Sequence, residues 1–180
     1  MDSRHAFRAK WHDYNDGAYF ITICAATRHY IFGCISDNEM HLSAEGNIVQ
    51  NCVLSIPDHY EKVELWNHVV MPNHVHIILN VKKQNKEGKG NFKIGCLKPP
   101  LHGASCNNNH FNSRVAVIIR SFKAACTIEV NRWRRLHDLP PVQLWQRNYH
   151  EHIIRTQRSY ENIMEYVYTN VERWESDCFY

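Results

Sequence analysis

Three stretches of the chain carry the pattern of β-strands. In residues 19–24 (YFITIC), Tyr19, Ile21 and Ile23 alternate with the other side chains, and most residues are β-branched or aromatic. Two further β-rich segments, residues 63–70 and 75–81, are separated by the tripeptide Met-Pro-Asn. Since proline cannot donate to a central ladder, this break predicts a hairpin connection or the start of the second strand.

A spacing near 3.6 residues marks three helices. The first follows Ser43, a suitable N-cap, and ends at Pro57. The second begins at Ser113 and continues past Trp133, with an apolar stripe on one side. The third covers residues 159–174. All three are amphipathic and are therefore expected to pack on a sheet.

The order of these elements predicts the fold. Residues 144–155 look extended, which gives the order β, α, β, β, α, β, α. Short antiparallel strands with helices on one face indicate an α+β sandwich of the ferredoxin-like type. Residues 83–111 show no periodicity and predict an exposed loop inserted in a single domain that spans 1–180.

The positive charge of the chain is unevenly distributed. The net charge is only +3, from 21 Lys+Arg and 18 Asp+Glu, but residues 82–160 hold 15 of the basic and 4 of the acidic residues. Such a block is either a solvated face or a surface that neutralises phosphates. Charge alone does not decide between the two.

Several protein classes can be set aside. No run approaches the roughly 18 apolar residues of a membrane helix, and the first residues lack an apolar signal core. The seven cysteines are scattered without a CxxC pair, which argues against a disulfide scaffold or a structural zinc site. We therefore expect a soluble, cytoplasmic protein without membrane partners.

The segment MPNHVHIILN, residues 71–80, carries the most informative pattern. If residues 75–81 form a strand, the apolar side chains cover the core while His74 and His76 point to the opposite face. The two imidazoles would then lie close enough to share one divalent cation. An HxH pair is also common on strands without any metal, so this pattern alone leaves both interpretations open.

The third helix adds a second candidate group. Its polar stripe contains Tyr166 and, one turn later, Asn170. Tyr168 lies beside Met164 and Val171 and is expected to pack. For any single tyrosine the simpler interpretation is a core residue with a solvated hydroxyl.

These residues carry a resemblance to a known family. MPNHVHIIL resembles the HUH motif (His, bulky hydrophobe, His) of single-tyrosine transposases of the insertion-sequence and REP-associated type. The similarity continues through IIRSFKAACT, LWQRNYHEHIIR and EYVYTNVERW, in the family's order, over residues 19–174. It implies a metal-binding strand in a ferredoxin-like sheet, with the tyrosine on the C-terminal helix.

The resemblance also implies roles for individual residues. His74, His76 and Asn170 would bind Mg²⁺ or Mn²⁺, and Tyr166 would be the nucleophile. A tyrosine that attacks a DNA phosphodiester forms a 5′-phosphotyrosine and releases a 3′-hydroxyl. The substrate implied is single-stranded DNA with hairpins, and homodimers that share active sites are possible in such a family. His150 and His152 are weak candidates for a general base.

The basic block supplies candidates for nucleic-acid contacts. On the second helix, the polar stripe that includes Arg120, Lys123 and Arg134 is either a solvated face or a ridge that faces phosphates. Further cations follow in the predicted last strand. The candidate phosphate contacts are Arg120, Lys123, Arg134, Arg147 and Arg155, and the candidate stacking groups are Trp145 and Tyr149. A core position is the competing interpretation for Trp145.

Two other functions fit parts of the pattern. A histidine-triad hydrolase needs HxHxH, but the third position here is Ile78. A non-catalytic regulator, derived from a transposase and binding DNA or RNA hairpins, would keep the basic and aromatic residues without needing a metal. Formation of a covalent DNA adduct separates this regulator from an active transposase.

Overall fold

An antiparallel sheet of four strands forms the centre of the computed structural model, which describes residues 16–27, 29–83 and 113–176. The strand order is β4-β5-β1-β6. The bounds are β1 Gly17–Cys24, β4 Val63–Val70, β5 His74–Val81 and β6 His150–Ile154. With crossovers between β1 and β4 and between β5 and β6, this order is the ferredoxin-like arrangement, so the predicted fold class is confirmed. The loop expected at 83–111 lies outside the described residues apart from Lys83.

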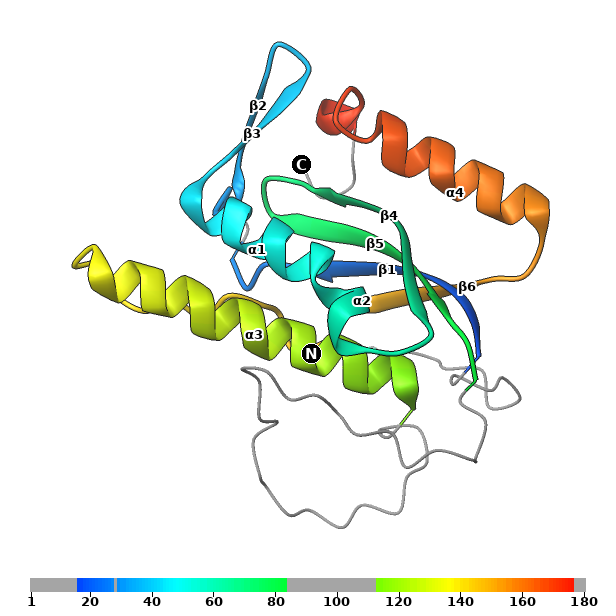
Figure 1. Cartoon of the computed structure of the whole chain (residues 1–180). Coiled ribbons are helices and arrows are strands. Elements are labelled where there is room, and N and C mark those ends of the chain that lie inside the picture. The colour runs from blue at the N-terminus through cyan, green and yellow to red at the C-terminus, as the bar shows by residue number, and fades with distance from the viewer. Residues whose placement is uncertain (1–15, 28, 84–112, 177–180) are drawn as a thin grey trace, which may run out of the picture.

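The helices occupy both faces of the sheet (Figure 1), which corrects the expectation of helices on one face. Helices α1 (Ala44–Leu54), α2 (Ile56–His59) and α3 (Arg114–Leu136) cover the face that carries the main hydrophobic core. Helix α4 (Gln157–Thr169) lies on the opposite face, where Met164 contacts Asn67 of β4. The strand alternation assigns the core to side chains such as Val75 and Ile77, which are fully buried.

Side-chain caps explain where the long helices begin. Ser43 accepts a hydrogen bond from the backbone N–H of Gly46, and Ser113 accepts one from Ala116. Thr156 caps α4 in the same way. These caps satisfy backbone donors that have no partner within the helix. Ser43 is the N-cap that the sequence predicts, and Ser113 lies where the second helix is predicted to begin.

The sequence-based prediction missed a hairpin. β2 (Gly33–Ser36) pairs with β3 (Glu39–Leu42) in a separate two-stranded sheet, which projects beyond the central sheet in Figure 1. Asp37 and Asn38 form its turn with φ values of 53° and 59°. The strands are only four residues long, so they carry too little periodicity to be recognised. The last helix is also shorter than predicted, because it ends at Thr169 and only a 3₁₀ turn (Trp174–Ser176) follows.

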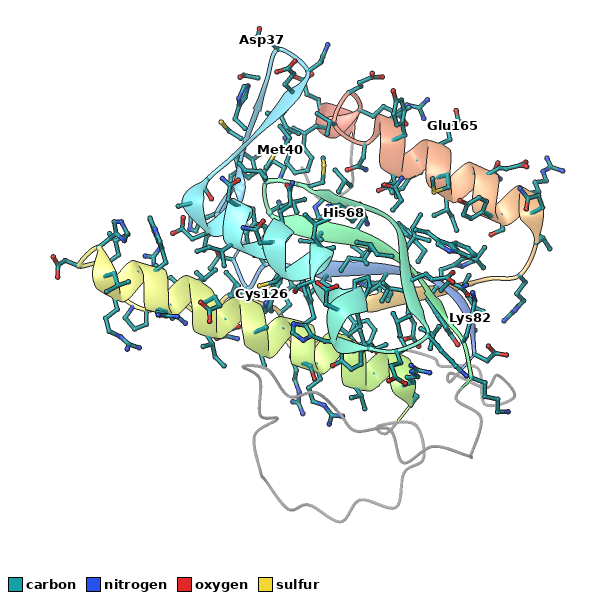
Figure 2. The ribbon with its side chains drawn as sticks, in the orientation of Figure 1. Asp37, Met40, His68, Lys82, Cys126 and Glu165 are labelled. Atoms are coloured by element: carbon teal, nitrogen blue, oxygen red, sulfur yellow. The ribbon has the colours of Figure 1, made fainter. Side chains whose placement is uncertain are left out.

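The cysteines in the described residues are free thiols. Cys52 of α1 and Cys126 of α3 form a hydrogen bond where these two helices meet. Figure 2 labels Cys126 in this position. Among the helices of the described residues, none is both long enough and apolar enough to cross a membrane.

Candidate active site

Strand β5 places two histidines side by side on the sheet face that α4 covers. His74 and His76 point away from the main core, as the alternation predicts, and β5 is flanked by β4 and β1. Their side chains are 0% and 1% exposed. The two Nε2 atoms are 3.0 Å apart. The rings therefore form one buried pair rather than two exposed side chains.

Each ring is held by a hydrogen bond at its other nitrogen. His74 Nδ1 lies 2.9 Å from Oδ1 of Asn73, and His76 Nδ1 lies 2.9 Å from Oγ1 of Thr22. An amide oxygen only accepts, so the proton of neutral His74 is on Nδ1. The Thr22 hydroxyl can accept from His76 in the same way. With both protons on Nδ1, the two Nε2 lone pairs are directed toward the space between the rings.

The protonation state of His76 also suits a ligand. Burial, and after it the neighbouring charge of His74, lowers the pKa of His76 well below its usual range. The ring is therefore neutral at pH 7. Neutral imidazole is the form that binds a metal ion.

The spacing of the pair fits a divalent cation. Two imidazole lone pairs that face each other at 3.0 Å need a proton or a cation between them. Two ligands at right angles, each about 2.1 Å from an ion, are about 3.0 Å apart, whereas a tetrahedral ion would separate them by about 3.4 Å. The observed spacing is compatible with two ligands of an octahedral ion such as Mg²⁺ or Mn²⁺, and it is also the length of an N–H···N hydrogen bond. Within the described ranges, no group of three or more His, Cys, Asp or Glu side chains could hold a metal, so other oxygen donors would complete the coordination.

The tyrosine of α4 reaches this pair within one chain. The hydroxyl of Tyr166 lies 3.3 Å from His76 Nε2. Phe20 of β1 packs against both groups, with ring centroids 5.1 Å from His76 and 5.9 Å from Tyr166. By contrast, Tyr168 is 82% exposed, which corrects the expectation that it packs. The helix places Tyr166 toward the sheet and Tyr168 toward solvent because they are two positions apart.

Asn170 lies at the C-cap of α4 and is 2% exposed. It is four positions after Tyr166, so both side chains occupy the same face of the helical turn. Trp174 follows, 5% exposed, with its ring centroid 6.0 Å from that of His74. The end of α4 therefore encloses the histidine pair.

Sequence reasoning missed the residues that orient the imidazoles. Thr22 is directly opposite His76 in the β1–β5 register, and Phe20 is the next residue on the same face. The alternation of residues 19–24 already assigned both to the face opposite the core. What the sequence did not provide is the register between the two strands, which decides which side chains meet.

Two of the three cations on the polar stripe of α3, Lys123 and Arg134, have partners within the protein, while Arg120 is exposed. Lys123 donates to the carbonyl oxygens of Gln146 and Arg147, at 2.6 and 3.0 Å. Burial lowers the pKa of the Lys123 ammonium. Arg134 donates to the carbonyl of Pro140 and forms an ion pair with Glu45 at 2.6 Å. The stripe anchors the extended segment 140–147, so Lys123 and Arg134 are held in structural contacts.

The other candidates for DNA contacts fall into two groups. Arg120, Arg147 and Arg155 are exposed. Trp145 is 5% exposed and packs in the core against Phe32 and Phe122, so a base has no access to its ring. Tyr149 is half-buried against the same core.

The candidate general bases lie on the edge strand β6. His150 pairs with Thr22 and His152 with Phe20 in the β1–β6 register, so both side chains are on the face of the histidine pair. Both are exposed, and His152 Nε2 lies 3.4 Å from Oγ of Ser159. A base role for either remains a prediction.

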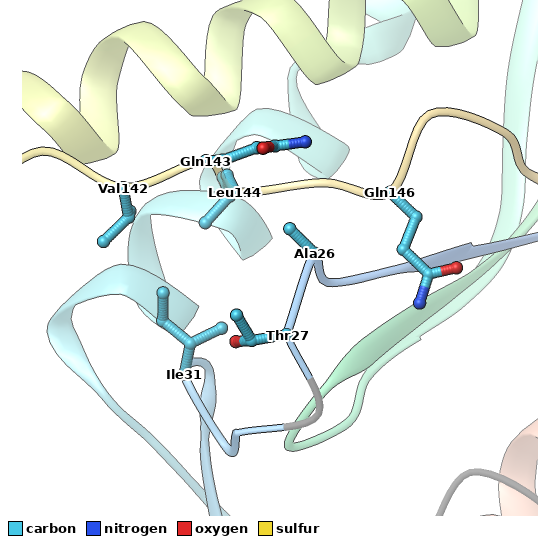
Figure 3. A pocket seen from close by; sticks show the side chains of 7 residues that line it. All are labelled: Ala26, Thr27, Ile31, Val142, Gln143, Leu144 and Gln146. Atoms are coloured by element: carbon cyan, nitrogen blue, oxygen red, sulfur yellow. The ribbon is translucent and has the colours of Figure 1, made fainter.

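A cavity of about 280 Å³ lies just after the end of β1 (Figure 3), and neither histidine of the pair lines it. Its walls include Ile31, Val142 and Leu144, and the amides of Gln143 and Gln146. None of its described lining residues is ionisable. The cavity therefore offers no side-chain acid or base, and the hydroxyl of Thr27 has no ionisable partner among the lining residues.

Comparison with known proteins gives one sequence relative over the whole chain. No protein-family model matches. A protein of Haemophilus influenzae (strain ATCC 51907 / DSM 11121 / KW20 / Rd), described as uncharacterized, is 36% identical over 180 residues, which is 98% of this chain and 93% of the relative. The chain belongs to the family of this Haemophilus protein.

The fold of this family has a counterpart among solved structures. A REP-associated tyrosine transposase bound to a REP hairpin superposes with a TM-score of 0.56 at 15% identity, covering 93% of this chain and 74% of the transposase. At this identity the likeness establishes the fold. The family therefore has a transposase-like fold.

Proposed function

We propose that this protein is a metal-dependent transesterase that nicks and rejoins single-stranded DNA through a 5′-phosphotyrosine, as HUH single-tyrosine transposases do. The observation that carries the proposal is the approach of the Tyr166 hydroxyl to 3.3 Å from His76 Nε2. A candidate nucleophile and a candidate metal ligand, 90 positions apart in the chain, meet in one part-buried site. A purely structural tyrosine would not need to contact the nitrogen that a metal would use.

The reaction exchanges one phosphoester for another. Tyr166 Oη forms a bond to the phosphorus, and the bond between phosphorus and the 3′-oxygen breaks. The phenol releases its proton to water, and the leaving 3′-oxygen takes one up, so the number of protons is unchanged. Attack by the 3′-hydroxyl on the phosphotyrosine reverses the step and allows joining. Phe20 keeps the phenol against His76 throughout, because it packs on both rings.

His74 and His76 would hold the Mg²⁺ or Mn²⁺ ion, with Asn170 as the candidate third ligand. The ion would polarise the scissile phosphate and balance its developing charge, a contribution of several kcal/mol. The amide oxygen of Asn73 holds His74 in the tautomer that this requires, and the Thr22 hydroxyl is able to accept the Nδ1 proton of His76 in the same way. The burial of both rings excludes the water that would compete for them.

The comparison supports DNA as the substrate. The transposase with the same fold is bound to a REP hairpin, and we extend hairpin recognition to this protein as part of the proposal. Arg147 and Arg155 are exposed cations on the two sides of β6 and are suited to contact phosphates. Such contacts make binding weaker as the salt concentration rises.

A covalent trap tests the proposal. Purified protein is incubated with hairpin DNA that has randomised single-stranded flanks, in Mn²⁺ or in a chelator, and the adducts are separated on a denaturing gel. The wild type is expected to form a metal-dependent adduct that Tyr166→Phe abolishes. Tyr168→Phe is the matched control, since this ring is exposed on the same helix, and it should leave the adduct intact.

His76→Ala tests the metal-binding part of the same proposal. It removes one of the two imidazoles and should reduce adduct formation by at least the factor of ten that one lost ligand partner typically costs. An adduct that survives Tyr166→Phe would refute the choice of nucleophile. If hairpins bind in a salt-sensitive way and no adduct forms with any metal, the protein is the non-catalytic regulator instead.

A further inference from the structure

A second cavity, of about 390 Å³, lies beside the first turn of α4. It is lined by Ala18 of β1, Trp66 of β4, Ile154 at the end of β6, and Arg155 and Tyr160 from the segment that enters α4. We refer to it as the Trp66 cavity. It combines two aromatic side chains and a guanidinium, whereas the cavity of Figure 3 has neither.

The aromatic wall of the Trp66 cavity is held in place. Trp66 is 40% exposed, although it lies on a strand of the central sheet. Its indole N–H donates to Glu64 Oε2 at 3.2 Å, and its ring meets that of Tyr160 edge to face at 5.2 Å. Glu64 is fixed in turn by Asn80 and Lys82. An exposed indole that two side chains, Glu64 and Tyr160, hold in place is suited to receive a flat apolar ligand.

The position of the cavity relates it to the candidate active site. Tyr160 and Tyr166 are six residues apart on α4, which is about 9 Å along the helix axis. Both contact the sheet, Tyr160 through Trp66 and Tyr166 through His76. At a rise of about 3.4 Å per nucleotide, two or three stacked nucleotides span this distance. A strand presented to Tyr166 could therefore reach the cavity with a nearby base.

We propose that the Trp66 cavity binds a nucleobase of the single-stranded substrate, about two or three nucleotides from the phosphate that Tyr166 attacks. This inference rests on the proposed function. The base stacks on the exposed face of the Trp66 indole, and the Arg155 guanidinium contacts the adjoining phosphate. Stacking on aromatic rings accepts every base, because each base has a π-face. The cavity thus sets the register of the strand rather than its sequence.

Binding and an abasic scan test the inference. The Tyr166→Phe protein, which cannot form an adduct, is titrated by fluorescence anisotropy with hairpins whose randomised flanks carry one abasic site at successive positions. Trp66→Ala should weaken binding of intact DNA about tenfold. Trp66→Phe keeps a ring and should restore most of this loss. Tyr168→Ala, which removes an exposed ring elsewhere on α4, serves as the control and should bind as the parent does.

The losses of DNA binding caused by Trp66→Ala and by the abasic site should not add. One abasic position is expected to weaken binding to the parent by the same factor as Trp66→Ala, and to have no further effect in Trp66→Ala. The inference is overturned if Trp66→Ala binds like the parent, if no DNA binds, or if the two losses add at every position. If the wild type forms the covalent adduct but DNA binding does not depend on Trp66, only the role proposed for the cavity is overturned. Trp66-dependent binding without an adduct would support the cavity and overturn the transesterase.

Discussion

The clearest test of the site's organisation is the substitution of Thr22 by valine. Thr22 is 6% exposed, and its hydroxyl is the partner of His76 Nδ1. Valine has nearly the same shape but offers no acceptor. In our account the Thr22 hydroxyl accepts the Nδ1 proton of His76, so the valine removes this acceptor and makes the tautomer with the proton on Nε2 accessible. In that tautomer the Nε2 lone pair that faces His74 is lost.

The expected effect is large on metal affinity and small on stability. Loss of a partner that orients a ligand typically lowers metal affinity about 10- to 100-fold, which corresponds to about 1.4–2.8 kcal/mol. The lost hydrogen bond itself costs about 1–3 kcal/mol of folding free energy, since it leaves a buried imidazole nitrogen unsatisfied. Titration calorimetry with Mn²⁺ measures the first quantity, and urea unfolding measures the second.

A matched threonine separates the two effects. The hydroxyl of Thr127 on α3 is hydrogen-bonded too, but it donates to a backbone carbonyl, Lys123 O at 2.8 Å, and does not contact the histidines. Thr127→Val should change the unfolding free energy slightly and leave the Mn²⁺ affinity unaltered. If Thr22→Val binds Mn²⁺ as tightly as the wild type, the hydroxyl does not set the tautomer of His76, and our account of the histidine pair is wrong.

Three further predictions concern the rest of the molecule. Arg134→Ala strands Glu45, only 11% exposed in its side chain, and should lower the free energy of unfolding in urea by about 2–4 kcal/mol. Burial lowers the pKa of His68 and of His76, so the unfolded chain binds protons first on acidification. The contribution of these two histidines to folding stability is then fully present above about pH 6.5 and is lost as the pH falls below it. Thermal melts from pH 7.5 to 5 will detect this loss, and a melting temperature that does not change with pH would contradict it. Gly33 has φ 140°, and a Cβ there would lie 2.1 Å from a carbonyl oxygen of the paired strand, so Gly33→Ala should lower the melting temperature.

The polar stripe of α3 shows a limit of reading charge from sequence. Its spacing correctly predicts a polar face of a helix, and a basic face suggests phosphates. The structure instead pairs Lys123 and Arg134 with backbone carbonyls and with Glu45. The carbonyl partners belong to segment 140–147, which has no periodicity, so no pattern in the sequence could identify it as the ligand of this face. A cation with a buried partner and a cation that binds DNA look identical in a sequence.

Local rules determine the parts of the candidate site that lie on single elements. The period of two along β5 puts His74 and His76 on one face, and the helical period puts Asn170 one turn after Tyr166. Both relations hold wherever the elements pack, so the sequence alone determines them. Tertiary structure decides the rest: the β1–β5 register brings Thr22 to His76, and the docking of α4 brings the phenol to the same nitrogen. Register and docking arise from contacts between residues far apart in the chain, whose free energies depend on the packing of the whole sheet and not on any local pattern.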